Sequence, residues 1–114
     1  MINLEVYNCT SAIMSVRIDC DDNNVTAYLE GELDHHAAKS IREQIDETLE
    51  RLRPEVLTLD FKSVTFMDSS GIGLVMGRFR TMQLFGGKVV VKNASLHIRK
   101  VMRLAGLDRL ADFQ

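Results

Sequence analysis

The residues best placed to do chemistry in this chain are two adjacent serines within the stretch FMDSSGIGLVMGRF, residues 66–79. Ser69 and Ser70 stand between Asp68 and Gly71, at the junction of an apolar run and a segment with helical spacing. The start of a helix leaves backbone N–H groups unpaired and carries partial positive charge, so such a junction attracts anions. The serines could therefore belong to a helix cap, a nucleophile, a phosphate cradle or a site that accepts a phosphoryl group.

Two of these possibilities fail on motif spacing. A phosphate-binding loop needs G-x-G-x-x-G or G-x-x-x-x-G-K-[ST], whereas Gly71, Gly73 and Gly77 do not fit either spacing and no lysine follows them. A hydrolase nucleophile elbow needs G-x-S-x-G, and the residues around the serines are MDSSG. Capping by Asp68 or Ser69, with the glycines allowing close packing, is the alternative without chemistry.

A second polar stretch, GELDHH at residues 31–36, closes one expected strand and opens a helix. Asp34 stands where an N-cap belongs, and His35 and His36 follow in the first turn. Adjacent histidines there are usually solvated, because helical metal ligands need i, i+4 spacing on one face, and we expect no metal. A Ser/His/Asp hydrolase assembled from Asp34, one of these histidines and Ser69 is a further alternative, since such triads are defined by geometry and not by order.

The elements that must position these residues alternate between strand and helix. Period-two stretches separated by the turn residues DDNN predict an N-terminal hairpin, and later segments switch to helical spacing. The expected strands are Met1–Asn8, with the weakest pattern, then Ile13–Cys20, Val25–Gly31, Val56–Phe61, Lys88–Lys92 and Leu110–Phe113, and the expected helices run from Asp34 to before Pro54, from Ser70 to before Gly86-Gly87, and from Ser95 to Ala105. This order predicts an α/β fold, a mixed sheet that begins with an antiparallel hairpin and has helices covering one side.

Helical spacing also predicts which side chains face the core. They are Ala38, Ile41, Ile45, Thr48 or Leu49, and Leu52 in the first helix; Ile72, Val75, Phe79 and Met82 in the second; and Ile98, Val101, Met102 and Ala105 in the third. Ser95 is the expected N-cap of the third helix.

Composition excludes several function classes. The 114 residues fit a single domain, 1–114, with one core. A net charge of −2 gives no basic surplus for binding nucleic acid. No leader-like start and no run of roughly 20 apolar residues is present, so we expect a cytoplasmic protein that does not act in a membrane. Cys9 and Cys20 lie in strand-like stretches outside any C-x-x-C pair, which predicts free thiols packed as small apolar residues.

Taken together, GELDHHAA and FMDSSGIGLVMGRF, separated by a helix and the strand VLTLDF, resemble the STAS-domain anti-sigma factor antagonists of spore-forming bacteria, particularly the sporulation type. The likeness covers about Ile13 to Phe113. It includes the element order β-β-α-β-α-β-α, the Gly86-Gly87 junction before a strand, and the late turn Ala105-Gly106-Leu107.

The resemblance implies a phosphorylation switch. In that family the anti-sigma factor is a serine kinase that uses ATP, and it phosphorylates the serine directly after the motif aspartate, here Ser69. The unphosphorylated antagonist binds the anti-sigma factor and frees the sigma factor, and a phosphatase restores this form. The residues we expect at the partner interface are Asp34, His35, His36, Asp68, Ser69, Ser70 and Gly71.

The resemblance therefore predicts a binding protein without catalytic residues or a cofactor. The sequence leaves three functional hypotheses open. The first is the sporulation-type antagonist, the second is a STAS module that serves another partner such as a stress-response complex, and the third is the small serine hydrolase. A helix-start hydroxyl without a positioned base has no route to becoming a nucleophile, which disfavours the hydrolase.

Overall fold

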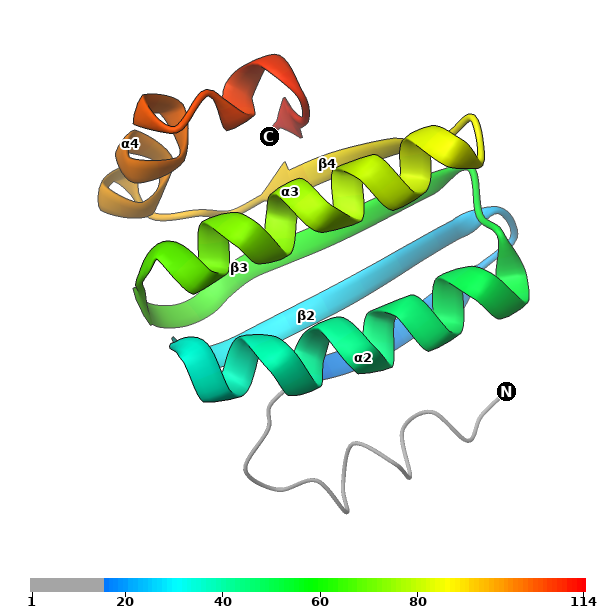
Figure 1. The fold of residues 1–114 in the computed structure, drawn as a ribbon, viewed down its shortest axis with the longest axis horizontal. Helices are drawn as coiled ribbons and strands as arrows, with labels where there is room; N and C mark the ends of the chain where they lie inside the picture. Colours follow the sequence, from blue (N-terminus) through cyan, green and yellow to red (C-terminus); the bar gives the residue numbers. More distant parts are fainter. Residues whose placement is uncertain (1–15) are drawn as a thin grey trace.

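The computed structural model describes residues 16–114, which form a five-stranded sheet with helices on one face (Figure 1). The elements are β1 (Val16–Asp21), β2 (Asn24–Leu33), α2 (His35–Leu52), β3 (Val56–Met67), α3 (Ser69–Leu84), β4 (Lys88–Lys92), α4 (Leu96–Leu104), the short 3-10 helix η1 (Leu107–Arg109) and β5 (Asp112–Phe113). The expected strand Met1–Asn8, and residues 13–15 of the expected first hairpin strand, lie outside the described residues.

The sheet has the strand order β1-β2-β3-β4-β5. β1 pairs with β2 in antiparallel fashion, and each of the other neighbouring pairs is parallel. Asp22 sits in the turn of the hairpin with a positive φ of 58°, a conformation that aspartate tolerates better than most residues. The predicted mixed sheet with an N-terminal antiparallel hairpin is confirmed.

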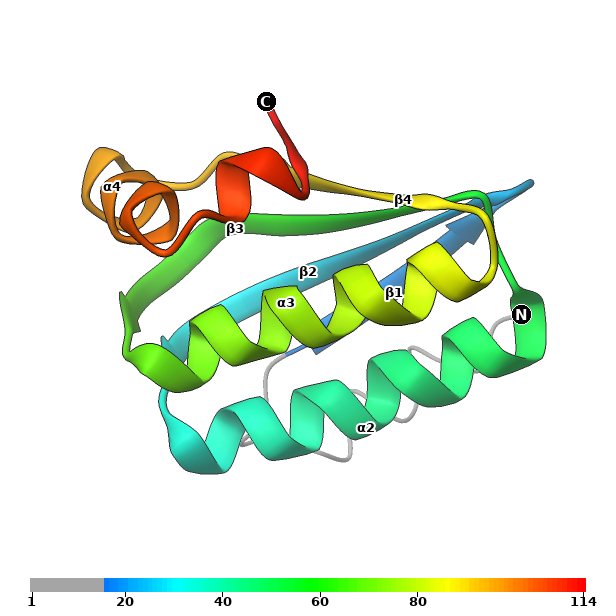
Figure 2. The same cartoon turned by 45° about the horizontal axis from the view of Figure 1, so that its top comes forward.

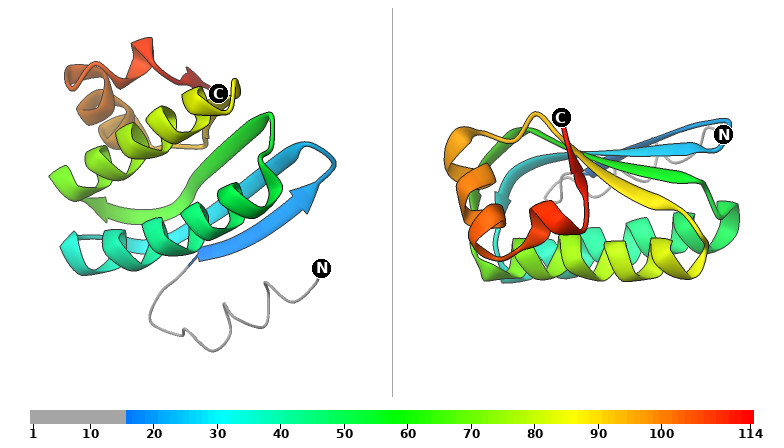
Figure 3. Two further views of the ribbon diagram at one scale, coloured as in Figure 1. Left: turned by 45° about the vertical axis from the view of Figure 1, so that its right-hand side comes forward. Right: turned by 90° about the horizontal axis from the view of Figure 1, so that it is seen from above.

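α2 and α3 lie side by side on one face of the sheet (Figures 2 and 3). Buried side chains from the inner face of the sheet and from the helices form one hydrophobic cluster within residues 16–114. Ala38, Ile41, Ile45 and Leu49 of α2 are buried as predicted, together with Thr48. The prediction for Leu52 was wrong: it is 44% exposed, because it is the last residue of α2 and the chain turns away at Arg53 with a φ of 45°.

The core faces of the two later helices differ in part from the prediction. In α3, Val75 and Met82 are buried, whereas Ile72 and Phe79 are half-buried against the core and Leu74 takes a fully inward position. The prediction that Ala105 faces inward was wrong. α4 ends at Leu104, so Ala105 is an exposed C-cap.

In α4, Ile98 and Met102 are buried as predicted, and Val101 is half-buried. Ser95 is the predicted N-cap, and its hydroxyl accepts a hydrogen bond of 3.2 Å from the Ile98 N–H. Cys20 is a free thiol but is exposed near the end of β1, so its predicted packing in the core was wrong. Cys9 lies outside the described residues.

β3 is longer than its sequence pattern predicts. It has twelve residues opposite ten of β2, and the pairing register shifts between Tyr28 and Glu30 and again between Gly31 and Glu32. These bulges place extra residues in β3, so the apolar alternation breaks after Phe61 and the next buried apolar side chain is Val64. Gly31 has a φ of 89° at the second irregularity, a conformation that glycine adopts without strain.

Candidate functional site

The two motif stretches meet at one edge of the sheet. Leu33 at the end of β2 pairs with Met67 at the end of β3, and the Asp68 N–H donates to the Leu33 carbonyl oxygen at 3.4 Å. Because β2 and β3 are parallel, both strands reach this edge together, and α2 and α3 begin beside each other (Figure 1). The structure therefore brings residues 31–36 and 66–71 together.

Asp68 is the N-cap of α3. Its backbone is extended, with a φ of −102°, and its Oδ1 accepts a hydrogen bond of 2.8 Å from the Ser70 N–H. Ser69 is therefore the first residue of the helix and not its cap. Its side chain is exposed, and none of the side-chain hydrogen bonds found within residues 16–114 involves its hydroxyl. The Ser69 hydroxyl is therefore exposed and has no side-chain hydrogen-bond partner within the described residues.

Gly71 lies where the first turn of α3 packs against the end of β3. It is buried, and a Cβ at this position would collide with the Met67 side chain and touch that of Leu33. A residue with a Cβ would force the Met67 side chain to move, so glycine allows the first turn of α3 to pack this closely on the end of β3. Gly71 thus fixes where Ser69 and Ser70 stand, and its own surface is hidden.

The start of α2 is also capped by an aspartate, which accepts from the third residue after it, whereas Asp68 accepts from the second. The Asp34 Oδ1 accepts a hydrogen bond of 3.0 Å from the Ala37 N–H, so the predicted N-cap is confirmed. His35 and His36 are exposed, and their ring centroids are 5.9 Å apart at a tilt of 60°. No hydrogen bond found in residues 16–114 joins either histidine to Asp34, Ser69 or Ser70, so no catalytic triad is assembled there.

A groove runs between the first halves of α2 and α3. This α2–α3 groove has a volume of about 520 Å³ and is lined by His35, Ala38, Lys39, Arg42, Ser70, Gly73 and Leu74. Its basic side chains all come from α2, at the spacing i, i+4, i+7 of one helical face, while α3 contributes small or apolar ones. No acidic residue is among these described lining residues. An anionic group in the groove would therefore meet basic side chains and no acidic side chain among these residues.

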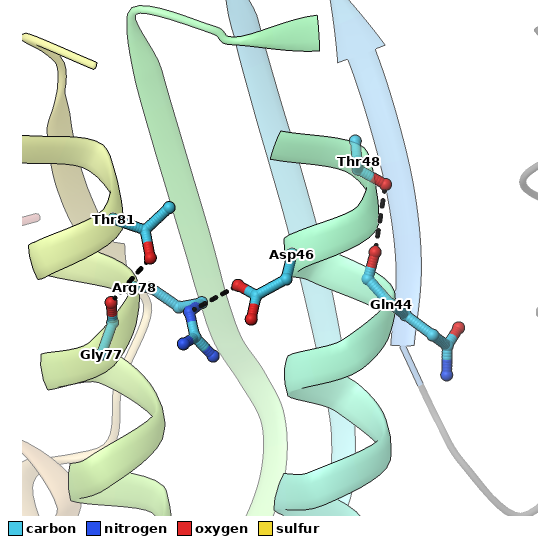
Figure 4. A network of polar contacts seen from close by, with 6 residues as sticks. All are labelled: Gln44, Asp46, Thr48, Gly77, Arg78 and Thr81. Atoms are coloured by element: carbon cyan, nitrogen blue, oxygen red, sulfur yellow. Dashed lines mark hydrogen bonds and ion pairs between the residues drawn. The ribbon is translucent and has the colours of Figure 1, made fainter. Parts of the chain in front are cut away.

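Further along the same two helices, an ion pair closes the space between them (Figure 4). The Arg78 Nε lies 3.1 Å from the Asp46 Oδ1, and the Arg78 side chain is 7% exposed. The contact lacks the alignment of a hydrogen bond, and the Arg78 Nη1 is buried without a hydrogen-bond partner within residues 16–114. Burial lowers the pKa of Arg78, and the Asp46 charge partly offsets this. Burial also raises the pKa of Asp46, against the opposing effect of Arg78.

Sequence reasoning missed both the groove and the ion pair. The spacing of His35, Lys39 and Arg42 on one helical face was a usable signal for the groove, because side chains at i, i+4 and i+7 share a face. The burial of Arg78 had no comparable signal, because an arginine in an otherwise apolar helix face is usually exposed.

No helix within residues 16–114 combines the length and the apolar character that a bilayer crossing requires. Within the same residues, no three histidine, cysteine, aspartate or glutamate side chains gather in a way that could hold a metal ion.

Comparison with known proteins agrees with this geometry. Residues 15–114 match the family model of the STAS domain. The anti-sigma F factor antagonist of Paenibacillus polymyxa is 35% identical over 99 residues, which cover 85% of this chain and 85% of that protein.

Two solved structures have the same fold. The anti-sigma factor antagonist SpoIIAA in its unphosphorylated form is 31% identical with a TM-score of 0.73, over 88% of this chain and 87% of that one. The Bacillus cell fate determinant SpoIIAA in the phosphorylated form is 33% identical with a TM-score of 0.72, over 88% and 91%. The chain belongs to the STAS-domain family of anti-sigma factor antagonists, which are binding proteins and not enzymes.

Proposed function

We propose that this protein is a phosphorylation-controlled antagonist of an anti-sigma factor and that Ser69 is its switch. The unphosphorylated chain binds the anti-sigma factor, a serine kinase, and so releases the sigma factor. The observation that carries the proposal is the exposed Ser69 hydroxyl at the first position of an Asp68-capped helix, in the motif that matches the family. The name of the Paenibacillus polymyxa relative supports the choice of partner.

The switch follows from the charge that Ser69 can gain. In the kinase reaction the Ser69 Oγ forms a bond to the γ-phosphorus of ATP, ADP leaves, and the hydroxyl proton passes to a base of the kinase. A neutral hydroxyl can lie within an interface at little cost, whereas the phosphoryl group adds about −1.5 to −2 charges. A partner surface that is acidic or apolar opposite Ser69 would then be repelled or would have to desolvate a dianion.

The fold is expected to tolerate this modification. The start of α3 offers unpaired N–H groups and a dipole that favour an anion by about 0.3 to 1 kcal/mol. The chain is similar to both the unphosphorylated and the phosphorylated SpoIIAA structures, with TM-scores of 0.73 and 0.72, so both of those forms have this fold. Affinity for the partner changes, while the domain stays folded.

The interface that we propose centres on the two helix starts. It comprises Asp34, His35, His36, Asp68, Ser69, Ser70 and Gly71. Gly71 is buried and contributes by allowing the first turn of α3 to pack against Met67. A serine phosphatase removes the phosphate and restores the binding form, and the cycle runs in the cytoplasm within a single domain, 1–114. Neither nucleic acid nor a membrane takes part. A stress-response partner would use the same switch with a different kinase.

The proposal is tested by mapping the phosphate. Incubation with the cognate anti-sigma kinase and Mg-ATP should add one phosphate at Ser69, because Ser69 is exposed whereas Ser70 is half-buried beside the groove. Peptide mass spectrometry distinguishes the two serines, with Ser69→Ala and Ser70→Ala as matched variants. Modification that persists in Ser69→Ala and maps to Ser70 or Thr65 would overturn the assignment.

A further inference from the structure

We propose that the α2–α3 groove receives an aspartate or glutamate side chain of the anti-sigma kinase. This inference rests on the proposed function and adds to it a second contact, distinct from Ser69. The groove supplies the positive charge through Lys39 and Arg42 and the space through Gly73 of α3.

The charge of the groove is unbalanced. Lys39 and Arg42 are exposed, and neither belongs to an ion pair found within residues 16–114. The opposite wall offers Ser70, Gly73 and Leu74, none of which carries charge. Space around Gly73 is open, since a Cβ there would meet no atom within 4 Å. A carboxylate in the groove would therefore gain cationic partners without displacing an acid already present.

A buried cation lies behind the groove. Arg78 is one helical turn beyond Leu74, and Asp46 is one turn beyond Arg42. The guanidinium lies between the two helices with its terminal nitrogens toward their first halves, and its buried Nη1 has no hydrogen-bond partner within residues 16–114 (Figure 4). Arg42 and Arg78 both lie near the Asp46 carboxylate, and Glu50 adds a second negative charge there, so the attraction for an anion comes from Lys39 and Arg42 in the groove wall.

The occupant is assigned to the kinase because of where the groove opens. Ser70 lines the groove and is the direct neighbour of Ser69, so a partner that covers Ser69 also lies over the mouth of the groove. An arginine beside an open wall can hold a carboxylate in a bidentate pair. A phosphate on Ser69 would place an anion next to Ser70 in the groove wall, so phosphorylation would repel the incoming carboxylate as well.

The test uses the full chain and its cognate kinase in calorimetric titrations at low and high salt. The double variant Lys39→Glu, Arg42→Glu should bind roughly tenfold more weakly or worse, and its affinity should fall less with added salt. The matched control is Lys100→Glu, Arg103→Glu, which reverses a lysine and an arginine that are exposed on α4, away from the groove. The control should bind like the unmodified chain, and both double variants should melt like it.

Three other outcomes would contradict the groove contact, and they can be told apart from a failure of the proposed function. If the groove variant bound the kinase as tightly as the unmodified chain, the groove contact would be contradicted. Loss of binding in Ser69→Asp would still support the proposed function. Equal weakening of both double variants would point to overall charge and not to the groove. Inorganic phosphate is the probe for a small-anion site: NMR shifts of groove residues that saturate with phosphate, without any effect of the groove variant on kinase binding, would assign the groove to a free anion.

Discussion

The two ends of the α2–α3 pair use polar residues in opposite ways. At the starts of the helices, Asp34 and Asp68 are N-caps, and the side chains directly after them, those of His35 and Ser69, are exposed. In the second halves, Asp46 and Arg78 face each other across the helix contact, with little access to water for Arg78. We expect polar groups at the first end to tolerate single changes, whereas at the second end the buried Arg78 charge depends on Asp46.

A phosphorylation switch is compatible with the first end of the helix pair and not with the second. A phosphate added at an exposed helix start is hydrated and is favoured by the helix dipole, so it changes the surface and leaves the core intact. The same change at a buried pair would place an unpaired charge in the interior at the cost of several kcal/mol. Substitutions at the two ends should therefore differ in their effect on the free energy of unfolding.

The largest effect is expected at the buried pair. Asp46→Ala leaves the Arg78 charge buried without compensation and should lower the free energy of unfolding by about 2 to 3 kcal/mol. Arg78→Met should change it by less than about 1 kcal/mol, because the remaining Asp46 side chain is 34% exposed and can be hydrated. Urea denaturation measures both values.

Glu47→Ala is the matched control for Asp46→Ala, because Glu47 is the exposed acid next to it on α2. Its effect should stay within about 0.5 kcal/mol. If Asp46→Ala and Glu47→Ala lowered the free energy of unfolding equally little, the buried ion pair would be no more sensitive to substitution than an exposed residue. The contrast between the two ends of the helix pair would then be contradicted.

A smaller and matched effect is expected at the two caps. Asp34→Ala and Asp68→Ala each remove one hydrogen bond to a backbone N–H at a helix start, and each should cost about 1 kcal/mol. Asn retains a cap oxygen, so Asp34→Asn and Asp68→Asn should cost only a few tenths. Thermal melts compare the four variants, and a loss well above 2 kcal/mol for either alanine would show that its cap has a further structural role.

Much of this architecture could be predicted from local signals. Asp34, Asp68 and Ser95 cap helices where a capping residue precedes an apolar periodic stretch. Lys88–Lys92 was predicted to be a strand, and the structure has β4 there, with Val89, Val90 and Val91 buried between exposed lysines. Such features depend on a few adjacent residues, so the sequence alone contains them.

The parts that could not be predicted depend on contacts between distant segments. The second half of β3 has no simple alternation because its bulges are set by pairing with β2. The burial of Arg78 depends on Asp46 from another helix, and the groove exists only because α2 and α3 start at the same sheet edge. The proposed role of Ser69 rests on the motif and on the resemblance, because a serine at a helix start also fits a simple cap.

The smallest effect on stability and the largest effect on binding are both expected at Ser69. Ser69→Ala removes the acceptor hydroxyl without adding charge, and Ser69→Asp adds a carboxylate that the helix start tolerates. Calorimetric titration with the anti-sigma kinase, paired with thermal melts, should show Ser69→Ala binding like the unphosphorylated chain and Ser69→Asp binding roughly a hundredfold more weakly, with similar melting temperatures. Equal binding of the two variants with equal melting would contradict a switch that works by charge at Ser69.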